Sequence, residues 1–317
     1  MSWFERNPKK TNVFILMVAL ILMTVAAELI LRFFFGLGNP VLYDSNPLYG
    51  FRLIPNQEVV RFHGAKIKVN NFGLRTNADW DNNRGDKVLF LGDSITYGGS
   101  YISNDELFSA LCVKQLPDIK AGSAGVNAWG VENIYGLVVE SGFLPAKFYV
   151  TTVCEEDFYR GLTRLQGMPF WCVRPKLAII ELFHYFCYRE LNKQYLKWQM
   201  FRNPLPADER VADKAVSKLK EMDSFLKAKG FIHLIYITPS RNQVSGKEPK
   251  DELLQKLFKK YNLPVVYLLD RIKPMKIESQ EIRSLFHDEI HLSKKGHALW
   301  GNLMSDDLKE VVKSVNR

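Results

Sequence analysis

Two short stretches far apart in the chain carry the side chains of a serine nucleophile and its base. The first is Gly92-Asp93-Ser94, and the second is Asp288-Glu289-Ile290-His291. A serine is a weak nucleophile unless a base takes its proton. An Asp three residues before a His can fold back and orient the imidazole, which fixes its tautomer. The spacing predicts acyl-transfer chemistry with Ser94 as nucleophile, His291 as base and Asp288 as the acid that orients His291.

The apolar run 88–91 must position this serine. It has the composition of a buried parallel strand, and it ends abruptly at the small, turn-permissive Gly92-Asp93-Ser94. Open α/β sheets carry their chemistry at the carboxyl ends of their strands, so Ser94 is expected at that edge. The plainer alternative is that Ser94 only caps a helix and that His291 is an ordinary surface histidine.

From Lys87 onward, strand-like and helix-like segments alternate. We expect strands at 87–92, 119–122, 148–153, 232–238 and 265–269. We expect helices at 105–116, at 131–142, from beyond 205 to 229, at 250–261, and from 294 onward. Alternation with short connections predicts an α/β fold, a three-layer αβα sandwich around a mainly parallel sheet.

At opposite ends of this alternating chain, Gly92-Asp93-Ser94 and Asp288-x-x-His291 resemble the GDSL/SGNH hydrolase family. The resemblance runs from about Lys87 to the C-terminus. It implies five strands in a flavodoxin-like order and ester hydrolysis by a Ser-His-Asp mechanism. It also implies substrates such as O-acetylated glycans, lipids or small esters.

Residues 123–130 match the second block of this family, in which a glycine N–H helps to form the oxyanion hole. Gly125 is the expected donor beside the N–H of Ser94, because backbone approaches a ligand closely only where no side chain intervenes. A simple turn from strand to helix would need the same glycine.

The third block departs from the family pattern. Where the family has an Asn that donates to the oxyanion, this chain has Glu156, and an ionised carboxylate cannot donate a hydrogen bond. Three explanations are open. Glu156 is turned away and Asn127 donates instead; Glu156 is protonated in a desolvated pocket and itself donates; or the domain is catalytically weak and serves binding. Asp157 is expected to hold the loop, and Asp93 to brace the serine turn.

Residues 11–35 are expected to anchor the chain in a membrane. A helix from Val13 to Leu31 would be about 28 Å long, enough to cross the hydrocarbon layer. Lys and Arg precede this run but are missing between Arg32 and Arg52. The positive-inside rule then makes 1–10 a cytoplasmic tail and places the rest in the periplasm or cell exterior. A cleaved signal peptide is the rival, which the length of the run argues against.

Three other segments complete the expected organisation. Glu28 and Arg32 stand one helical turn apart, so they either pair or leave Glu28 to contact another membrane subunit. Residues 36–83 predict a β-structured stalk, and 84–317 form the hydrolase domain. An insertion at about 160–205 contains the apolar aromatic run 177–186. It would form a lid, a binding wall, an interfacial helix or a plain core helix.

Composition excludes several classes of function. The 317 residues carry a net charge of +9 without a sustained basic run, which argues against nucleic acid and fits anionic lipid or acidic polysaccharide better. The four cysteines lack metal-ligand spacing, so no metal is expected, although disulfides are open outside the membrane. There is no phosphate loop or dinucleotide-binding glycine pattern, so no cofactor is expected.

These observations predict a membrane-anchored serine esterase of the SGNH type that removes or transfers acetyl or other acyl groups on cell-envelope glycans. One alternative is an O-acetyltransferase subunit that works with a membrane acyltransferase partner. Another is a non-catalytic binding or assembly subunit, and that interpretation rests on Glu156 alone.

Overall fold

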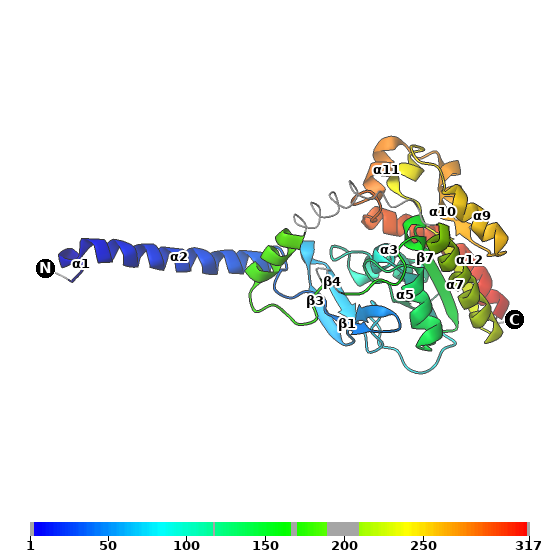
Figure 1. Ribbon diagram of the computed structural model, residues 1–317, viewed down its shortest axis with the longest axis horizontal. Coiled ribbons are helices and arrows are strands. Elements are labelled where there is room, and N and C mark those ends of the chain that lie inside the picture. Colours follow the sequence, from blue (N-terminus) through cyan, green and yellow to red (C-terminus); the bar gives the residue numbers. More distant parts are fainter. Residues whose placement is uncertain (1–2, 117, 166–169, 189–208, 316–317) are drawn as a thin grey trace.

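The computed structural model describes residues 3–116, 118–165, 170–188 and 209–315 (Figure 1). A long helix leads from the N-terminus into an α/β body, and the C-terminus lies on the opposite side of that body (Figure 1).

Five parallel strands form the central sheet. They are β5 (Lys87–Gly92), β6 (Lys120–Ser123), β7 (Phe148–Val153), β8 (Ile232–Ile237) and β9 (Val266–Tyr267). Their order is β6-β5-β7-β8-β9, and every neighbouring pair is parallel. The predicted α/β class and flavodoxin-like order are therefore confirmed. Strand β9 is shorter than the expected 265–269 because Leu268 already begins a helix.

Strand β5 is buried along its whole length, as its uninterrupted apolar run predicts. Successive side chains of a strand point to opposite faces. Leu89 and Leu91 therefore enter one core, with residues of α5, α7 and α9. Val88 and Phe90 enter the other core, with residues of α4, α10, α11 and α12. Helices thus cover both faces of the sheet.

The two longest helices of the body, α7 and α12, both lie after residue 208. The body contains α3 (Ser94–Tyr97), α4 (Phe108–Cys112), α5 (Val131–Tyr135), α7 (Glu209–Ala228), α8 (Arg241–Val244), α9 (Glu252–Lys260), α10 (Leu268–Ile272), α11 (Ser279–Leu285) and α12 (Lys294–Val315). Single turns add η2 (Asn104–Glu106), η3 (Gly136–Glu140), η4 (Glu155–Phe158) and η5 (Lys273–Met275). The helix expected at 105–116 is thus broken into η2 and α4, since Leu107 between them is extended.

The N-terminal segment consists of α1 (Trp3–Arg6) and α2 (Pro8–Phe33). Helix α2 has no buried residue, and its apolar side chains face outward along most of its length. Among the described residues it is the one helix long and apolar enough to cross a membrane, a test that an N-terminal signal sequence also passes.

Two antiparallel hairpins follow α2: β1 (Tyr43–Asn46) with β2 (Gly50–Leu53), and β3 (Gln57–Val60) with β4 (Lys66–Val69). Both hairpins lie within 36–83, the segment expected to be β-structured, and the single turn η1 (Phe62–Gly64) lies between β3 and β4. Arg75 bridges both Val69 and Ser123, so the β3–β4 hairpin joins the edge of the main sheet at β6.

The insertion expected at 160–205 is described in part, since 166–169 and 189–208 lie outside the described residues. The described part contains a helix, Ala178–Tyr188, which lies beside the body end of α2 (Figure 1).

Candidate active site

Ser94 is the first residue of α3, directly after β5. The carboxylate of Asp93 accepts the backbone N–H of Ile95 at 2.8 Å, and this caps the helix. Gly98 ends the helix in the left-handed region, at φ 84°, where glycine adopts the backbone without strain. The short helix between these two residues presents a half-buried Ser94 at the carboxyl edge of the sheet.

The structure brings the three predicted catalytic side chains into one hydrogen-bonded chain. Ser94 Oγ lies 2.8 Å from His291 Nε2. The other ring nitrogen, His291 Nδ1, lies 2.7 Å from Asp288 Oδ2. Asp288 Oδ1 also accepts the backbone N–H of His291 at 2.8 Å, so the carboxylate holds both the ring and its backbone. With Asp288 accepting from Nδ1–H, Nε2 is left free to accept the serine proton.

Charge and burial shift the pKa values of this pair in opposite directions. Burial lowers the pKa of His291, but the hydrogen bond and negative charge of Asp288 outweigh it, and the net pKa is raised. For Asp288, burial raises the pKa, but hydrogen bonds from the His291 ring and from two backbone N–H groups dominate, and the net pKa is lowered. The pair therefore favours an ionised carboxylate beside a basic imidazole.

The predicted donors of an oxyanion hole are the N–H groups of Ser94 and Gly125 and the amide of Asn127. The N–H of Ser94 sits at the start of α3, where helix geometry provides no acceptor for it. Gly125 is buried, and its N–H donates to Ser123 Oγ at 3.2 Å. A Cβ on Gly125 would lie 2.3 Å from the backbone nitrogen of Tyr97, so this glycine is needed for packing against α3. Asn127 is half-buried, and its amide donates to Tyr43 Oη at 3.3 Å.

Glu156 follows β7 in the single turn η4, and its side chain is 68% exposed. Its carboxylate accepts a hydrogen bond from Arg160 Nη2 at 3.3 Å. An exposed carboxylate paired with a guanidinium acts as an acceptor. Of the three explanations for Glu156, this exposure argues against the second, in which the carboxyl group lies in a desolvated pocket. The other two explanations stay predictions.

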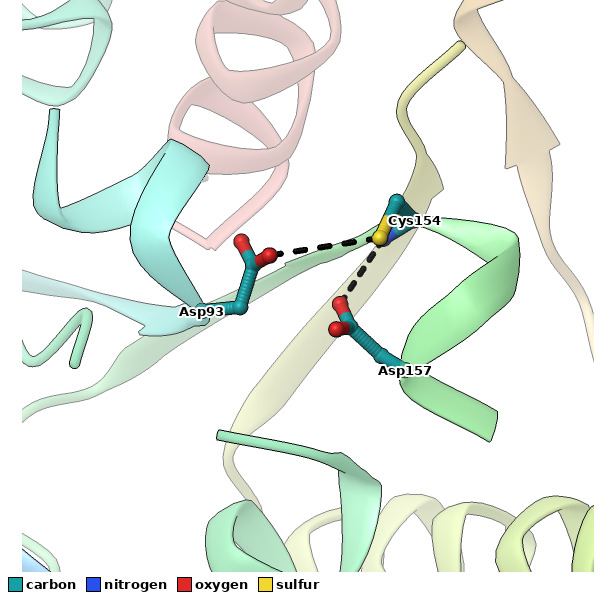
Figure 2. A group of neighbouring side chains, drawn as sticks. All are labelled: Asp93, Cys154 and Asp157. Atoms are coloured by element: carbon teal, nitrogen blue, oxygen red, sulfur yellow. Dashed lines mark hydrogen bonds between the residues drawn. The ribbon is translucent and has the colours of Figure 1, made fainter. Parts of the chain in front are cut away.

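The carboxylates of Asp93 and Asp157 and the thiol of Cys154 lie close together (Figure 2). Asp157 Oδ2 accepts the backbone N–H of Cys154 at 2.9 Å, and Cys154 Sγ lies 3.9 Å from Asp93 Oδ2. All three residues are buried. Burial and the nearby charge of Asp93 raise the pKa of Asp157, and burial raises the pKa of Asp93.

Arg160 supplies the positive charge for this cluster. Its Nη1 lies 2.8 Å from Asp157 Oδ1 and 3.8 Å from Asp93 Oδ2. Three ligand-type side chains this close together resemble a metal site, but a guanidinium already faces both carboxylates. We interpret the cluster as the support of the serine turn, which agrees with the structural roles expected for Asp93 and Asp157.

A cavity of about 440 Å³ is lined in part by Ile95 and Ile290, the neighbours of Ser94 and His291 in the chain. Ser94 and His291 themselves do not line it. The rest of the lining is rich in hydrogen-bond acceptors and includes Glu155, Glu156, Tyr159, Gln243, Glu248 and Asp251. Such a cavity is large enough for one sugar ring or a short acyl ester.

A second hydrogen-bonded set of three side chains, Thr151, His233 and Asp223, lies in the core. His233 Nε2 is 2.9 Å from Thr151 Oγ1, and His233 Nδ1 is 3.2 Å from Asp223 Oδ1. All three side chains are buried. This set satisfies polar groups between the sheet and α7, and no substrate can reach it. Hydrogen-bond distances of this kind do not by themselves make an active site. Of the two sets, only Ser94, His291 and Asp288 have side chains that are partly exposed to solvent.

Sequence reasoning missed Arg160. The signal was present, because Arg160 stands three and four residues after Asp157 and Glu156, a spacing at which helical side chains meet.

No family model matches the chain, and no characterised sequence is similar enough to count as a relative. Among solved structures, it is similar to the acetyl xylan esterase AlAXEase at 15% identity and a TM-score of 0.45, over 70% of this chain and 99% of that one. It is also similar to a lipase/acylhydrolase from Enterococcus faecalis, at 15% identity and a TM-score of 0.42, over 72% and 96% of the two chains.

A third similar structure is a two-domain esterase active on acetylated mannans, at 14% identity and a TM-score of 0.41, over 72% of this chain and 50% of that one. These are likenesses at low identity. In the described residues, the order of the parallel strands and the position of Ser94 after β5 resemble the arrangement expected of a GDSL/SGNH hydrolase.

Proposed function

We propose that this protein is a membrane-anchored serine ester hydrolase whose catalytic domain lies outside the membrane. The observation that carries the proposal is the chain of two hydrogen bonds from Ser94 through His291 to Asp288. His291 is poised to accept a proton, and Ser94 is half-buried at an open sheet edge beside a cavity. These are the requirements of an activated nucleophile.

In the proposed reaction, Ser94 Oγ attacks the ester carbonyl carbon while its proton passes to His291 Nε2. The N–H of Ser94 donates to the developing oxyanion, and Glu156 takes no part. Gly125 and Asn127 are the further donors in this proposal, and each would exchange its present acceptor, Ser123 Oγ or Tyr43 Oη, for the oxyanion. His291 then gives its proton to the leaving alkoxide, which breaks the ester bond and leaves an acyl-serine. Water or an acceptor hydroxyl releases the acyl group by the same steps in reverse.

For the substrate, we propose acyl esters on sugars, with acetyl esters of cell-envelope glycans as the class to test first. The adjacent cavity supports this choice, because carboxylate and amide groups accept hydrogen bonds from sugar hydroxyls. The helix α2 supports a location at a membrane by its length and apolar surface.

The test is fluorophosphonate labelling of the full chain in detergent, compared with Ser94→Ala and His291→Ala. Ser245→Ala is the matched control, because Ser245 is an exposed serine at the end of α8. Labelling of the wild type and of Ser245→Ala, lost in the other two variants, is the expected result. A folded wild-type protein that does not label would overturn the proposal. Acetate release from an acetylated oligosaccharide, dependent on Ser94, then tests the substrate class.

A further inference from the structure

The outer face of helix Ala178–Tyr188 is apolar and exposed, although the helix belongs to the body. Ile180 is 45% exposed, Phe186 is 63% exposed and Phe183 is 68% exposed. Monomeric proteins rarely leave such a patch in water unless it binds something.

The inner face of the same helix holds its one acidic residue. Glu181 is fully buried and pairs with Arg61, with Oε1 2.5 Å from Arg61 Nη2. Its other oxygen accepts the backbone N–H of Gly38 at 2.6 Å. The helix is therefore polar toward the protein and apolar toward the outside, the reverse of a surface helix in water.

The start of this helix is joined to the last turns of α2. The carboxylate of Glu28 accepts the backbone N–H groups of Ala178 at 2.8 Å and Ile179 at 3.1 Å, so a residue of α2 caps the second helix. Arg32 pairs with Glu28 at 2.6 Å and donates to the carbonyl of Lys176 at 2.9 Å. Glu28 and Arg32 therefore form an ion pair, which was one of the two expectations for them. Glu28 also contacts the first turn of helix Ala178–Tyr188, and Arg32 contacts the segment that leads into it.

These contacts fix the position of helix Ala178–Tyr188 along the axis of α2. Glu28 lies five residues before the end of α2 at Phe33, which is about 7.5 Å along a helix axis. Interfacial helices bury their apolar face about 5–10 Å into the boundary between headgroups and acyl chains. If α2 spans the bilayer, helix Ala178–Tyr188 starts within that boundary.

We propose that helix Ala178–Tyr188 lies in the outer membrane–water interface, with Ile180, Phe183 and Phe186 in contact with acyl chains. Its occupant is lipid, because the Glu28 cap holds the start of this helix against α2, whose exposed apolar side chains face lipid if α2 spans the bilayer. Arg174 and Lys176 precede the helix and are exposed, placed to meet the phosphates of anionic headgroups. The proposal rests on the membrane anchor of the proposed function.

Docking in this way also orients the active site. Helix Ala178–Tyr188 contributes Glu181 and Tyr185 to a small cavity that Tyr97, Ser100 and Asn127 also line. The helix thus lies against the segment that follows Ser94, and its contact with lipid brings that side of the site toward the bilayer.

The test uses spin labels on the full chain in nanodiscs of phosphatidylethanolamine and phosphatidylglycerol. Cys172 and Cys187 are changed to Ser, while the buried Cys112 and Cys154 are kept. One label replaces Phe183 (Phe183→Cys). Leu22→Cys in α2 and the exposed Asp306→Cys in α12 are the lipid and water controls. Power saturation compares collision of each label with oxygen, which partitions into lipid, and with a nickel chelate, which stays in water.

We expect the label at position 183 to collide more often with oxygen than with the nickel chelate. The depth calculated from this ratio should lie between the depths of the two control labels. A label as open to nickel as the Asp306 label would overturn the docking. A label shielded from both reagents would also overturn it, since protein would then cover the face. A Leu22 label outside lipid would refute the anchor itself, whereas fluorophosphonate labelling of the same samples reports separately on the hydrolase.

Discussion

The ring of Tyr101 stacks on the imidazole of His287, with the ring centroids 4.0 Å apart. The hydroxyl of Tyr101 also donates to the carbonyl oxygen of Leu292 at 3.1 Å. His287 and Leu292 flank the loop that carries Asp288 and His291, so one side chain holds both ends of that loop. Tyr101 itself lies in the segment that follows Ser94, and it therefore sets the distance between nucleophile and base.

Removing this ring should misplace the base. We expect Tyr101→Ala to lower kcat/KM about 10- to 100-fold, because displacing a catalytic group by about 1 Å can have effects of that size. Tyr101→Phe keeps the stacking on His287 and should stay within about threefold of the wild type. The pH midpoint should not move, since the His291–Asp288 contact remains. Full activity of Tyr101→Ala on an ester substrate would contradict the role.

The rate of fluorophosphonate labelling should rise with pH as His291 loses its proton. Because the pKa of His291 is raised above its ordinary value of 6.5, the midpoint of the rise should lie above 6.5. Asp288→Asn removes both the hydrogen-bond and the charge contribution that raise it. We expect that variant to have a lower midpoint and a rate reduced by at least about a hundredfold. A midpoint unchanged between the two proteins would refute the coupling.

Glu156 and Arg160 should respond very differently to substitution. Glu156→Asn breaks an exposed ion pair, and such pairs contribute about 0–1 kcal/mol, so labelling and thermal stability should change little. Arg160→Met removes the cation that faces Asp93 and Asp157, both buried. Breaking a buried pair in this way typically destabilises a protein by about 3–5 kcal/mol.

The control for this effect is the double variant Arg160→Met/Asp157→Asn. It removes a buried carboxylate together with the cation and should recover part of the lost thermal stability. An Arg160→Met protein that melts at the wild-type temperature would show that the cluster needs no cation.

His297 should make the protein less stable in acid. Burial, with a smaller contribution from the charge of Arg75, lowers the pKa of His297 from 6.5 to about 3. Between those two values the unfolded chain binds a proton that the folded chain does not. Stability contributed by the neutral histidine is thus complete above pH 6.5 and falls as pH decreases toward 3, by roughly 1.4 kcal/mol for each pH unit.

His297→Asn tests this. The ring accepts the backbone N–H of Phe108 at 3.1 Å through Nδ1, and an amide oxygen can replace that acceptor without titrating. Melting temperatures of the full chain in detergent, measured from pH 7 to pH 4, should fall less steeply for the variant. Parallel curves for the two proteins would exclude His297 as the source.

The sheet was predictable because its strands are continuous apolar runs that end in small residues. Val88 to Leu91 can form little else, and the alternation with helices fixes the parallel order. The contact between Ser94 and His291 was predictable for a related reason. Loops at the carboxyl edge of a parallel sheet can meet however far apart they lie in the sequence. These features depend on local pattern and on topology.

Other features depended on three-dimensional packing that no local pattern encodes. Gly125 was expected as a donor, and its closest neighbours turned out to be the backbone of Thr96 and Tyr97. The direction of Glu156 depends on Arg160, which the sequence analysis did not weigh. The Glu28 cap joins residues 150 positions apart. The composition of the insertion alone allowed a lid, a binding wall, an interfacial helix or a core helix.

The junction between α2 and the body is held by side chains at several points. Arg61 donates to the carbonyl oxygen of Gly36, and Glu181 accepts from the N–H of Gly38. A domain on a flexible linker samples a volume, and its effective concentration at any point falls as the linker lengthens. With these ties and the proposed anchor, Ser94 instead stays at one height above the bilayer. The protein would then find its substrates by lateral diffusion in two dimensions, and only ester groups at that height would be within its reach.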